Sequence, residues 1–321
     1  MSIDGGGIRG IFPAAVLAGL EEQFLGGSSI AGYFDLIAGT STGGILALGL
    51  GAGLTATELL RLYVDRGGEI FPPHGPGFIG QVMRRLQMAR RVVRYIYEQD
   101  ALARVLREKL GDRLFGASAK RLCVPSFEGE HGEIYIFKTP HHPDFKKDWR
   151  ESMLKVALAT SAAPTYYQPL RDDEYIFVDG GIWANNPVMI ALVEALASFD
   201  VEREQIRILS IGCGEGQYGV GGTKLTWGGL VQWRDIMNAA MRLQSQNALG
   251  QAGLLVGPEN LIRADLPRDF RKIGLDDWRA SVELLPSAAA RALNADGNRI
   301  AAALLQDPAE PYVPFYSESR T

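Results

Sequence analysis

The sequence predicts one α/β domain of three layers, in which a mostly parallel sheet lies between two layers of helices. Short apolar runs of strand length alternate with longer helical patterns along the 321 residues. The length suits one large α/β domain or two small ones. No linker-like, repetitive or low-complexity tract divides the chain, so we expect residues 1–321 to form a single domain.

The stretch FDLIAGTSTGG (Phe34–Gly44) contains the motif from which the rest of the sequence is interpreted. Phe34–Ala38 is typical of a short buried strand, and Ile45–Leu50 is typical of a buried helix. Ser41 lies between them, flanked by Gly39 and Gly43. This G-x-S-x-G pattern predicts a nucleophile elbow, a sharp strand-to-helix turn with an exposed serine hydroxyl, because only glycines allow the two elements to approach closely. The alternative is a plain tight turn in an α/β core.

One segment imitates a membrane-spanning helix. Leu36–Thr57 contains 22 residues without a charge, which is long enough to cross a bilayer. Six of these residues are glycines, and each would cost a continuous helix about 1 kcal/mol relative to alanine. We therefore expect a strand, an elbow and a buried helix here.

Composition and charge indicate which partners and which cellular compartment are consistent with the sequence. The net charge of -4 argues against a partner that is a nucleic acid polymer. Cys123 and Cys213 each lie in an apolar run, which favours reduced core residues of a cytoplasmic protein. No secretory signal pattern opens the chain.

The chain begins with a glycine run, DGGGIRG (Asp4–Gly10), followed by a helical pattern over Ile11–Phe24. Gly5, Gly7 and Gly10 satisfy G-x-G-x-x-G, which is consistent with a dinucleotide-binding turn. No acidic residue ends the next strand, as that motif would require. The same backbone N–H groups can instead hold the oxyanion of an acyl-transfer reaction.

The region after the elbow contains a loop and an amphipathic helix, each with two possible interpretations. Thr57 is expected to cap a helix that ends at Gly67-Gly68, and residues 67–80 read as a loop, either a mobile lip over an apolar pocket or a plain connector. Gln81–Tyr97 predicts an amphipathic helix whose charges are all arginines. Such a helix either lies on an anionic lipid surface or packs on the core with a solvated face.

Two strands, Arg121–Pro125 and Glu133–Phe137, are expected to form a hairpin or an adjacent pair. His141 and His142 follow them. Because serine hydrolases normally use a histidine base, either residue is a candidate for a Ser-His-Asp enzyme. The alternative is that both are polar loop residues.

A helix over Ser152–Ala163 precedes the strand Tyr175–Val178, which ends at Asp179 and two glycines. Asn186 and Pro187 are expected to begin the next helix as N-cap and first residue. A carboxylate at the end of a buried strand can meet a nucleophile held at the end of a neighbouring strand. Asp179 is therefore the candidate base, unless it only satisfies amides of the turn.

The C-terminal part supplies scaffold. We expect strands at Gln205–Ile211 and Asn260–Leu266, helices at Leu230–Leu249 and Ala288–Leu305, and a flexible loop in the glycine-rich stretch that begins at Gly212. No metal is expected, because the sequence has no H-E-x-x-H, C-x-x-C or EF-hand spacing.

Four of these motifs, DGGGIRG, GTSTGG, ATSAAPTYYQP and DGGIWANNP, occur in an order and spacing that resemble the patatin-like phospholipase family. The resemblance implies a patatin-like fold and a Ser-Asp dyad without histidine, with Ser41 as nucleophile and Asp179 as base. It also implies hydrolysis of acyl esters of phospholipids and lysophospholipids without a metal or other cofactor. The oxyanion hole that it implies is the backbone of the glycine run with an arginine beside it: Gly5, Gly6, Gly7 and Arg9.

An aspartate of ordinary pKa, about 3.9, is a poor base for a serine hydroxyl. We expect burial among apolar residues, or the hydrogen bond from the serine itself, to raise its basicity.

The stretches IFKTPHHPDF, LATSAAPTYY and GGIWANNPVM are similar to the bacterial branch of the family that cyclic dinucleotides activate in anti-phage defence (CBASS). This similarity implies a 3',3'-cGAMP-like activator, membrane phospholipids as substrate, and a cytoplasmic protein that acts peripherally on the inner membrane. It leaves a homo-oligomer open and marks no residue of a nucleotide site. Family members usually have more residues before DGGG, enough to complete a central strand, so the length of the first strand is left open here. A nucleotide-binding regulator without catalysis is the remaining alternative.

Overall fold

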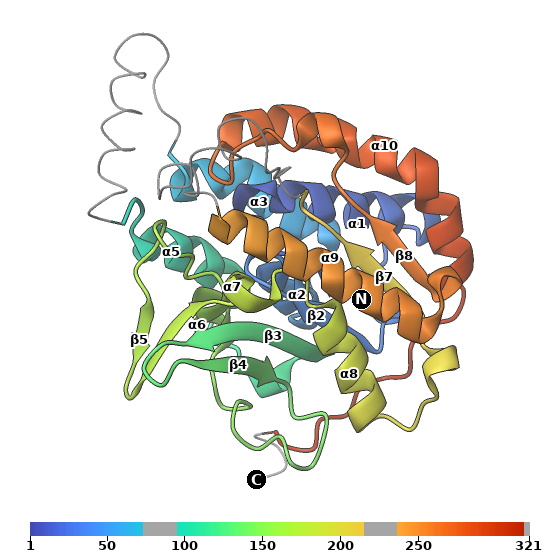
Figure 1. Cartoon of the computed structure of the whole chain (residues 1–321), viewed down its shortest axis with the longest axis horizontal. Coiled ribbons are helices and arrows are strands. Elements are labelled where there is room, and N and C mark those ends of the chain that lie inside the picture. The colour runs from blue at the N-terminus through green and yellow to red at the C-terminus, as the bar shows by residue number, and fades with distance from the viewer. Residues whose placement is uncertain (73–94, 215–235, 318–321) are drawn as a thin grey trace, which may run out of the picture.

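The computed structural model describes residues 1–72, 95–214 and 236–317 (Figure 1). The strands of these residues are β1 (Ser2–Ile3), β2 (Leu36–Gly39), β3 (Arg121–Glu128), β4 (Glu133–Lys138), β5 (Leu170–Asp172), β6 (Tyr175–Asp179), β7 (Ile208–Ile211) and β8 (Leu261–Ala264). They form one sheet in the order β5-β6-β3-β2-β1-β7-β8, and β4 pairs with β3 outside that row.

The sheet is mixed and mostly parallel, as predicted. β1 pairs in parallel with β2 and β7, β2 with β3, and β7 with β8. The pairs β3-β4, β3-β6 and β5-β6 are antiparallel. The predicted hairpin is β3 and β4, and the strand before the glycine run is β1, which has two residues.

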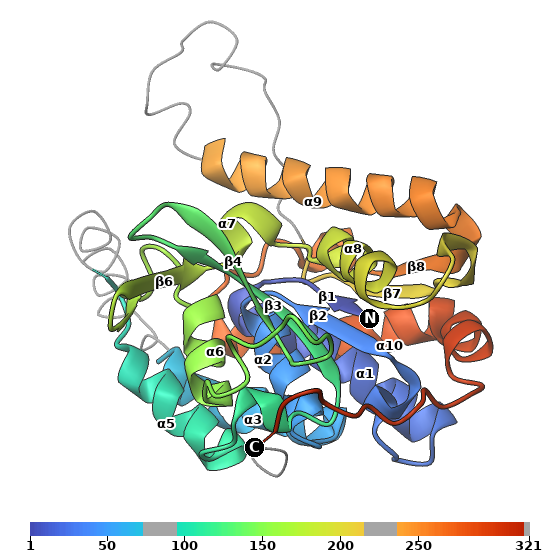
Figure 2. The same ribbon diagram turned by 90° about the horizontal axis from the view of Figure 1, so that it is seen from below.

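Helices cover both faces of the sheet. They are α1 (Ile11–Phe24), α2 (Thr42–Gly51), α3 (Ala56–Ile70), α5 (Gln99–Leu110), α6 (Met153–Thr160), α7 (Gly181–Ala184), α8 (Val188–Ser198), α9 (Ile236–Val256) and α10 (Trp278–Leu304). Figure 2 shows α7, α8 and α9 on one side of the sheet and the other helices on the opposite side. The predicted three-layer α/β/α arrangement is therefore confirmed.

The larger core lies between the sheet and the layer that contains α1, α2 and α10. Every residue of α2 is buried, which explains why this segment carries no charge. Leu36–Thr57 thus contains β2, the elbow and α2, as predicted. In the part of the chain that the structure describes, no helix combines the length and apolarity that crossing a membrane requires.

β2 and β6 lie end to end along the same edge of β3, with their carboxyl ends facing each other. β4 pairs with β3 from Cys123 onward and so occupies the other edge. β2 pairs with β3 only up to Ala38, which lies opposite Cys123. β6 joins the same edge from the opposite direction, and its last pair is Asp179 with Ser126. The carboxyl ends of β2 and β6 therefore meet at the middle of β3.

Two predicted boundaries of α3 are wrong. Its N-cap is Thr55, which forms a capping box with Glu58, and not Thr57. The helix also continues through Gly67 and Gly68 to Ile70. A Cβ at Gly67 would lie only 2.6 Å from Trp278 Cδ1. These glycines make room for the Trp278 ring and do not end the helix.

Other boundaries also differ from the prediction. α10 begins ten residues before Ala288 and contains Pro286 in its interior. α8 begins at Val188 with Pro187 as its N-cap residue, although the side chain of Asn186 accepts a hydrogen bond from Val188 N at 3.0 Å. Four predicted segments lie partly outside the described residues: most of the loop 67–80, most of the basic helix 81–97, most of the glycine-rich loop that begins at Gly212, and the first residues of the helix 230–249.

Candidate active site

Ser41 occupies the turn between β2 and α2 in a backbone conformation that is rare for a residue with a side chain, with φ 54° and ψ -120°. Such a conformation costs about 1–3 kcal/mol and persists only where the surroundings impose it. A Cβ at Gly39 would lie 2.1 Å from Gly43 O, and one at Gly43 would lie 2.2 Å from Ile3 O. The two glycines therefore permit the close approach that the turn requires.

Hydrogen bonds from neighbouring elements hold this turn in place. The amide of Ser41 donates to Thr160 Oγ1 at 3.0 Å, and the Thr160 hydroxyl donates to Pro125 O at 2.6 Å. The hydroxyl of Thr40 donates to Ala184 O at 2.6 Å. Thr160, at the end of α6, thus connects the elbow to β3.

The Ser41 hydroxyl donates to Asp179 Oδ2 at 2.6 Å. The other carboxylate oxygen, Oδ1, accepts the Gly181 N–H at 2.7 Å. Ser41 is 9% exposed and Asp179 is 6% exposed. The structure therefore brings the two residues together as a nearly dry Ser-Asp pair, although β2, which precedes Ser41, does not pair with β6, which ends at Asp179.

Burial raises the pKa of Asp179 to about 6, and the hydrogen bonds from Ser41 and Gly181 oppose this rise. The first part of our expectation is therefore confirmed. The second part is wrong, because a hydrogen bond donated to the carboxylate stabilises its charged form and lowers the pKa. Desolvation makes Asp179 the stronger base.

The glycine run lies beside this pair, since a Cβ at Gly5 would be 3.3 Å from Ser41 Cβ. Its three amides are not equivalent. The Gly5 N–H donates to Asn185 O at 3.0 Å. Within the described residues, the N–H groups of Gly6 and Gly7 have no hydrogen-bond partner. Two of the three predicted donors are thus available to a ligand, and the third is engaged.

The remaining predicted member of this region, Arg9, anchors the glycine run. Its Nη1 donates to Gly214 O at 2.5 Å. Asp4, at the start of the run, forms an ion pair with Arg263, with 2.5 Å between Oδ2 and Nη2. Arg9 therefore helps to hold the loop that carries the amides.

The two candidate histidines lie in other networks. His141 Nε2 lies 3.0 Å from Glu194 Oε1, and His141 Nδ1 lies 2.9 Å from Thr139 Oγ1. Burial lowers the pKa of His141. His142 accepts a hydrogen bond from Asp144 N at 3.3 Å. Neither ring is bonded to Ser41, whose acceptor is Asp179, so the structure does not assemble the predicted Ser-His-Asp alternative.

A profile of the family described as "Patatin-like phospholipase" matches residues 1–192, which include the elbow, the glycine run and Asp179. The chain belongs to the patatin-like phospholipase family. The resemblance of the four motifs is thereby confirmed over more than half of the chain.

Relatives of this patatin-like chain occur in bacteria and plants. A "cGAMP-activated phospholipase" of Vibrio cholerae serotype O1 is 38% identical over 226 residues, which cover 66% of this chain and 63% of that protein. A protein of the same name from Escherichia coli strain TW11681 is 37% identical over 224 residues, covering 66% and 61%. "Patatin-like protein 2" of Oryza sativa subsp. indica is 33% identical over 248 residues, covering 67% and 60%. The chain thus spans somewhat less than two thirds of the length of these relatives.

Sequence reasoning missed two residues of this patatin-like site, Thr160 and Asn185. Both lie in motifs that the sequence analysis singled out, ATSAAPTYYQP and DGGIWANNP. Their partners, the amides of Ser41 and Gly5, are more than 100 residues away in the chain, so no local pattern predicts the contacts.

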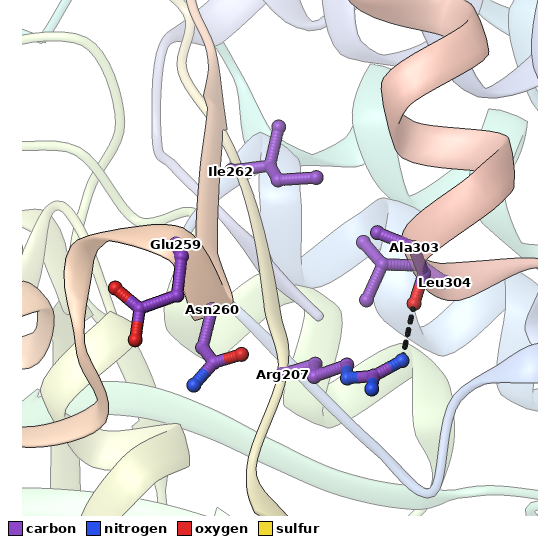
Figure 3. Close-up of a pocket in the computed structure, with 6 residues that line it drawn as sticks. All are labelled: Arg207, Glu259, Asn260, Ile262, Ala303 and Leu304. Atoms are coloured by element: carbon purple, nitrogen blue, oxygen red, sulfur yellow. Dashed lines mark hydrogen bonds between the residues drawn. The ribbon is translucent and has the colours of Figure 1, made fainter. Parts of the chain in front are cut away.

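A cavity of about 300 Å³ lies elsewhere, at the amino ends of β7 and β8 (Figure 3). Arg207 reaches across it and donates to Ala303 O at 3.1 Å. The cavity contains none of the predicted site residues. Its lining is Arg207, Glu259, Asn260, Ile262, Ala303 and Leu304.

Proposed function

We propose that this protein is a phospholipase that hydrolyses carboxylic esters of membrane phospholipids with Ser41 and Asp179. The observation that carries the proposal is the hydrogen bond of 2.6 Å from Ser41 Oγ to Asp179 Oδ2. This distance suits direct proton transfer between a nucleophile and its base.

In the proposed reaction, Asp179 accepts the proton of Ser41 as Oγ attacks the ester carbonyl carbon. The carbonyl oxygen becomes an oxyanion in the tetrahedral intermediate. When the intermediate collapses, the C–O bond to the alcohol breaks, and the protonated Asp179 returns its proton to the departing alkoxide. The products of this half-reaction are a lysophospholipid and an acyl group on Ser41.

Water completes the cycle. Asp179 takes a proton from water as the hydroxide oxygen attacks the acyl-enzyme, and it then protonates Ser41 Oγ as the fatty acid departs. The same carboxylate thus serves twice, and its pKa of about 6 leaves it mostly ionised at pH 7.

We assign the oxyanion to the N–H groups of Gly6 and Gly7. The structure supports these donors because neither has a partner among the described residues and both belong to the run that packs on Ser41. The Ser41 and Gly5 amides are less suitable, since they already donate to Thr160 and Asn185. Loss of one oxyanion donor typically raises the barrier by about 2.7–4 kcal/mol.

We further propose that a cyclic dinucleotide of the 3',3'-cGAMP type activates the enzyme, and that it acts peripherally on the bacterial inner membrane in anti-phage defence. The names of the bacterial relatives support an activator of this kind. The substrate class is supported by the family description.

The test is release of fatty acid from phospholipid vesicles by the full chain, measured with and without 3',3'-cGAMP. We expect release that the nucleotide increases, and no release by Ser41→Ala under either condition. Binding of the nucleotide without hydrolysis of any ester would contradict the proposal and favour the regulator. Hydrolysis by Ser41→Ala at the wild-type rate would contradict the assignment of the nucleophile.

A further inference from the structure

A second group of reactive side chains lies under α8, outside the hydrogen bonds of the Ser-Asp pair. Cys123 comes from β3, His141 from the segment after β4, and Glu194 from α8. The sulfur, a ring nitrogen and a carboxylate oxygen of these residues all lie within 4.8 Å of one another. The three residues are buried, with exposures of 0%, 5% and 4%. We call them the Cys-His-Glu cluster.

A contact on the Nδ1 side of the ring orients the imidazole of this cluster. His141 Nδ1 faces Thr139 Oγ1 at 2.9 Å, and this leaves Nε2 directed to Glu194 Oε1. Thr139 is itself fixed, because its hydroxyl oxygen accepts the Leu122 N–H at 2.8 Å. A second hydrogen bond of this kind is what orients most metal-ligating histidines.

The carboxylate is oriented in the same way. Lys138 Nζ lies 2.5 Å from Glu194 Oε2, so one oxygen is held by a cation and the other faces the cluster. Ser198 Oγ donates to Oε1 at 2.6 Å. Glu194 Oε1, the proposed ligand atom, thus lies beside both Ser198 Oγ and His141 Nε2, while Lys138 holds Oε2.

We propose that the Cys-His-Glu cluster is a binding site for Zn²⁺. Thiolate, imidazole and carboxylate are the three ligand types that zinc takes in proteins, at bond lengths of about 2.0–2.3 Å. A thiolate disfavours Mg²⁺ and Ca²⁺, which prefer oxygen ligands. With three protein ligands, the fourth position of a tetrahedral ion would hold water.

Binding requires definite changes in the cluster. The thiol proton of Cys123 is released to solvent as the S–Zn bond forms. The hydrogen bond between His141 and Glu194 opens, and the ring carries its proton on Nδ1, where it donates to Thr139 Oγ1. The thiolate and the Glu194 carboxylate supply two negative charges against the two positive charges of the ion, and the remaining positive charge is that of Lys138, whose side chain is 26% exposed and stays on Oε2.

The consequence for the fold is a cross-link between β3, the segment after β4, and α8. The ion would stabilise the native state because ligands that bind only the folded chain raise its stability. Metal binding is measured directly, so the test needs no activity measurement.

The experiment uses the full chain stripped of metal with a chelator and titrated with Co²⁺, which gives a thiolate-to-cobalt absorption band in the near ultraviolet. We expect one equivalent of Co²⁺ to produce the band and Zn²⁺ to remove it by displacement. Zn²⁺ should also raise the melting temperature. The band should be lost in Cys123→Ser and retained in the matched control Cys213→Ser, which replaces the other buried cysteine.

Further variants distinguish the proposed metal ligands from residues that only lie near them. Glu194→Gln and His141→Gln should weaken Co²⁺ binding, whereas His142→Gln should leave it unchanged. Thr139→Val, which removes the group behind the imidazole, should weaken it by about 10- to 100-fold. A wild-type chain without the band, or a band that survives in Cys123→Ser, would overturn the proposal. If Cys123→Ser does not fold, the band of the wild type and the weaker Co²⁺ binding of Glu194→Gln decide the question.

Discussion

Ser41 Oγ and Asp179 Oδ2 lie 2.6 Å apart although 138 positions separate the two residues in the chain. The two strands that deliver them do not pair with each other. They meet end to end along β3, where Ala38 pairs with Cys123 and Asp179 pairs with Ser126. The site thus lies where a parallel and an antiparallel strand converge on one edge of a shared neighbour.

The pH dependence of catalysis should follow the ionisation of Asp179. Its pKa of about 6 places the base in its active, charged form above that pH. We expect kcat/KM for a soluble, uncharged ester to be constant above about pH 7 and to fall about tenfold per unit well below pH 6. A profile that stays flat down to pH 4 would show that no group with this pKa acts as the base.

The same burial should make Asp179→Asn more stable than the wild type near neutral pH. The folded-state pKa is raised above 3.8, so the native state binds the proton more tightly than the unfolded chain. For this group, stability is highest below about pH 4, falls as the pH rises to about 6, and is constant above. Removing the charge should therefore add about 1–3 kcal/mol to the free energy of unfolding at pH 7.

This gain is measured by urea denaturation of both proteins at pH 4 and pH 7, and it should shrink at pH 4. Asp144→Asn is the matched control, because its side chain is 83% exposed and the same substitution should have little effect there. Equal gains at both pH values would contradict the argument.

The elbow should not tolerate a methyl group at Gly39. Its Cβ would lie 2.1 Å from Gly43 O and 2.8 Å from Gly44 N, both backbone atoms that cannot move aside. We expect Gly39→Ala to lower stability by more than about 3 kcal/mol, or to prevent folding. Gly250→Ala is the control, since nothing lies within 4 Å of the added Cβ in α9, and it should gain up to about 1 kcal/mol. Chemical denaturation of both variants gives the comparison.

Thr160 should act as a positioning residue for Ser41. Thr160→Val removes the acceptor of the Ser41 amide and the donor to Pro125 O, and both partners are buried. We expect a loss of about 1–3 kcal/mol in stability and a fall in kcat larger than any change in KM. Thr160→Ser keeps the hydroxyl and should restore most of kcat, which a purely structural effect of lost packing would not do.

Local patterns in the sequence were sufficient to predict much of the fold. The helix over Ile11–Phe24 has the predicted bounds, and the hairpin and elbow occur where the turn residues indicate. These features depend on near neighbours in the chain. The glycine at position 39, for example, is required by Gly43 only four residues later.

Features that depend on distant contacts were not predictable. The helix α3 continues through Gly67 and Gly68 because Trp278, some 210 positions away, packs on them and donates to Val64 O at 3.2 Å. α10 begins before Pro286, and the turns ahead of that proline are held by this contact with α3. The pairing of Gly5 with Asn185 changes which amides remain available, and no sequence signal marks it.

The central claim is that Ser41 is a nucleophile activated by Asp179. The most direct measurement is labelling of the full chain with a fluorophosphonate, followed by location of the adduct by peptide mass spectrometry. We expect one adduct, on Ser41, that is absent from Ser41→Ala, at least about 10³-fold slower in Asp179→Asn, and unchanged in His142→Ala. Labelling of Asp179→Asn at the wild-type rate, or an adduct only at another residue, would contradict the account.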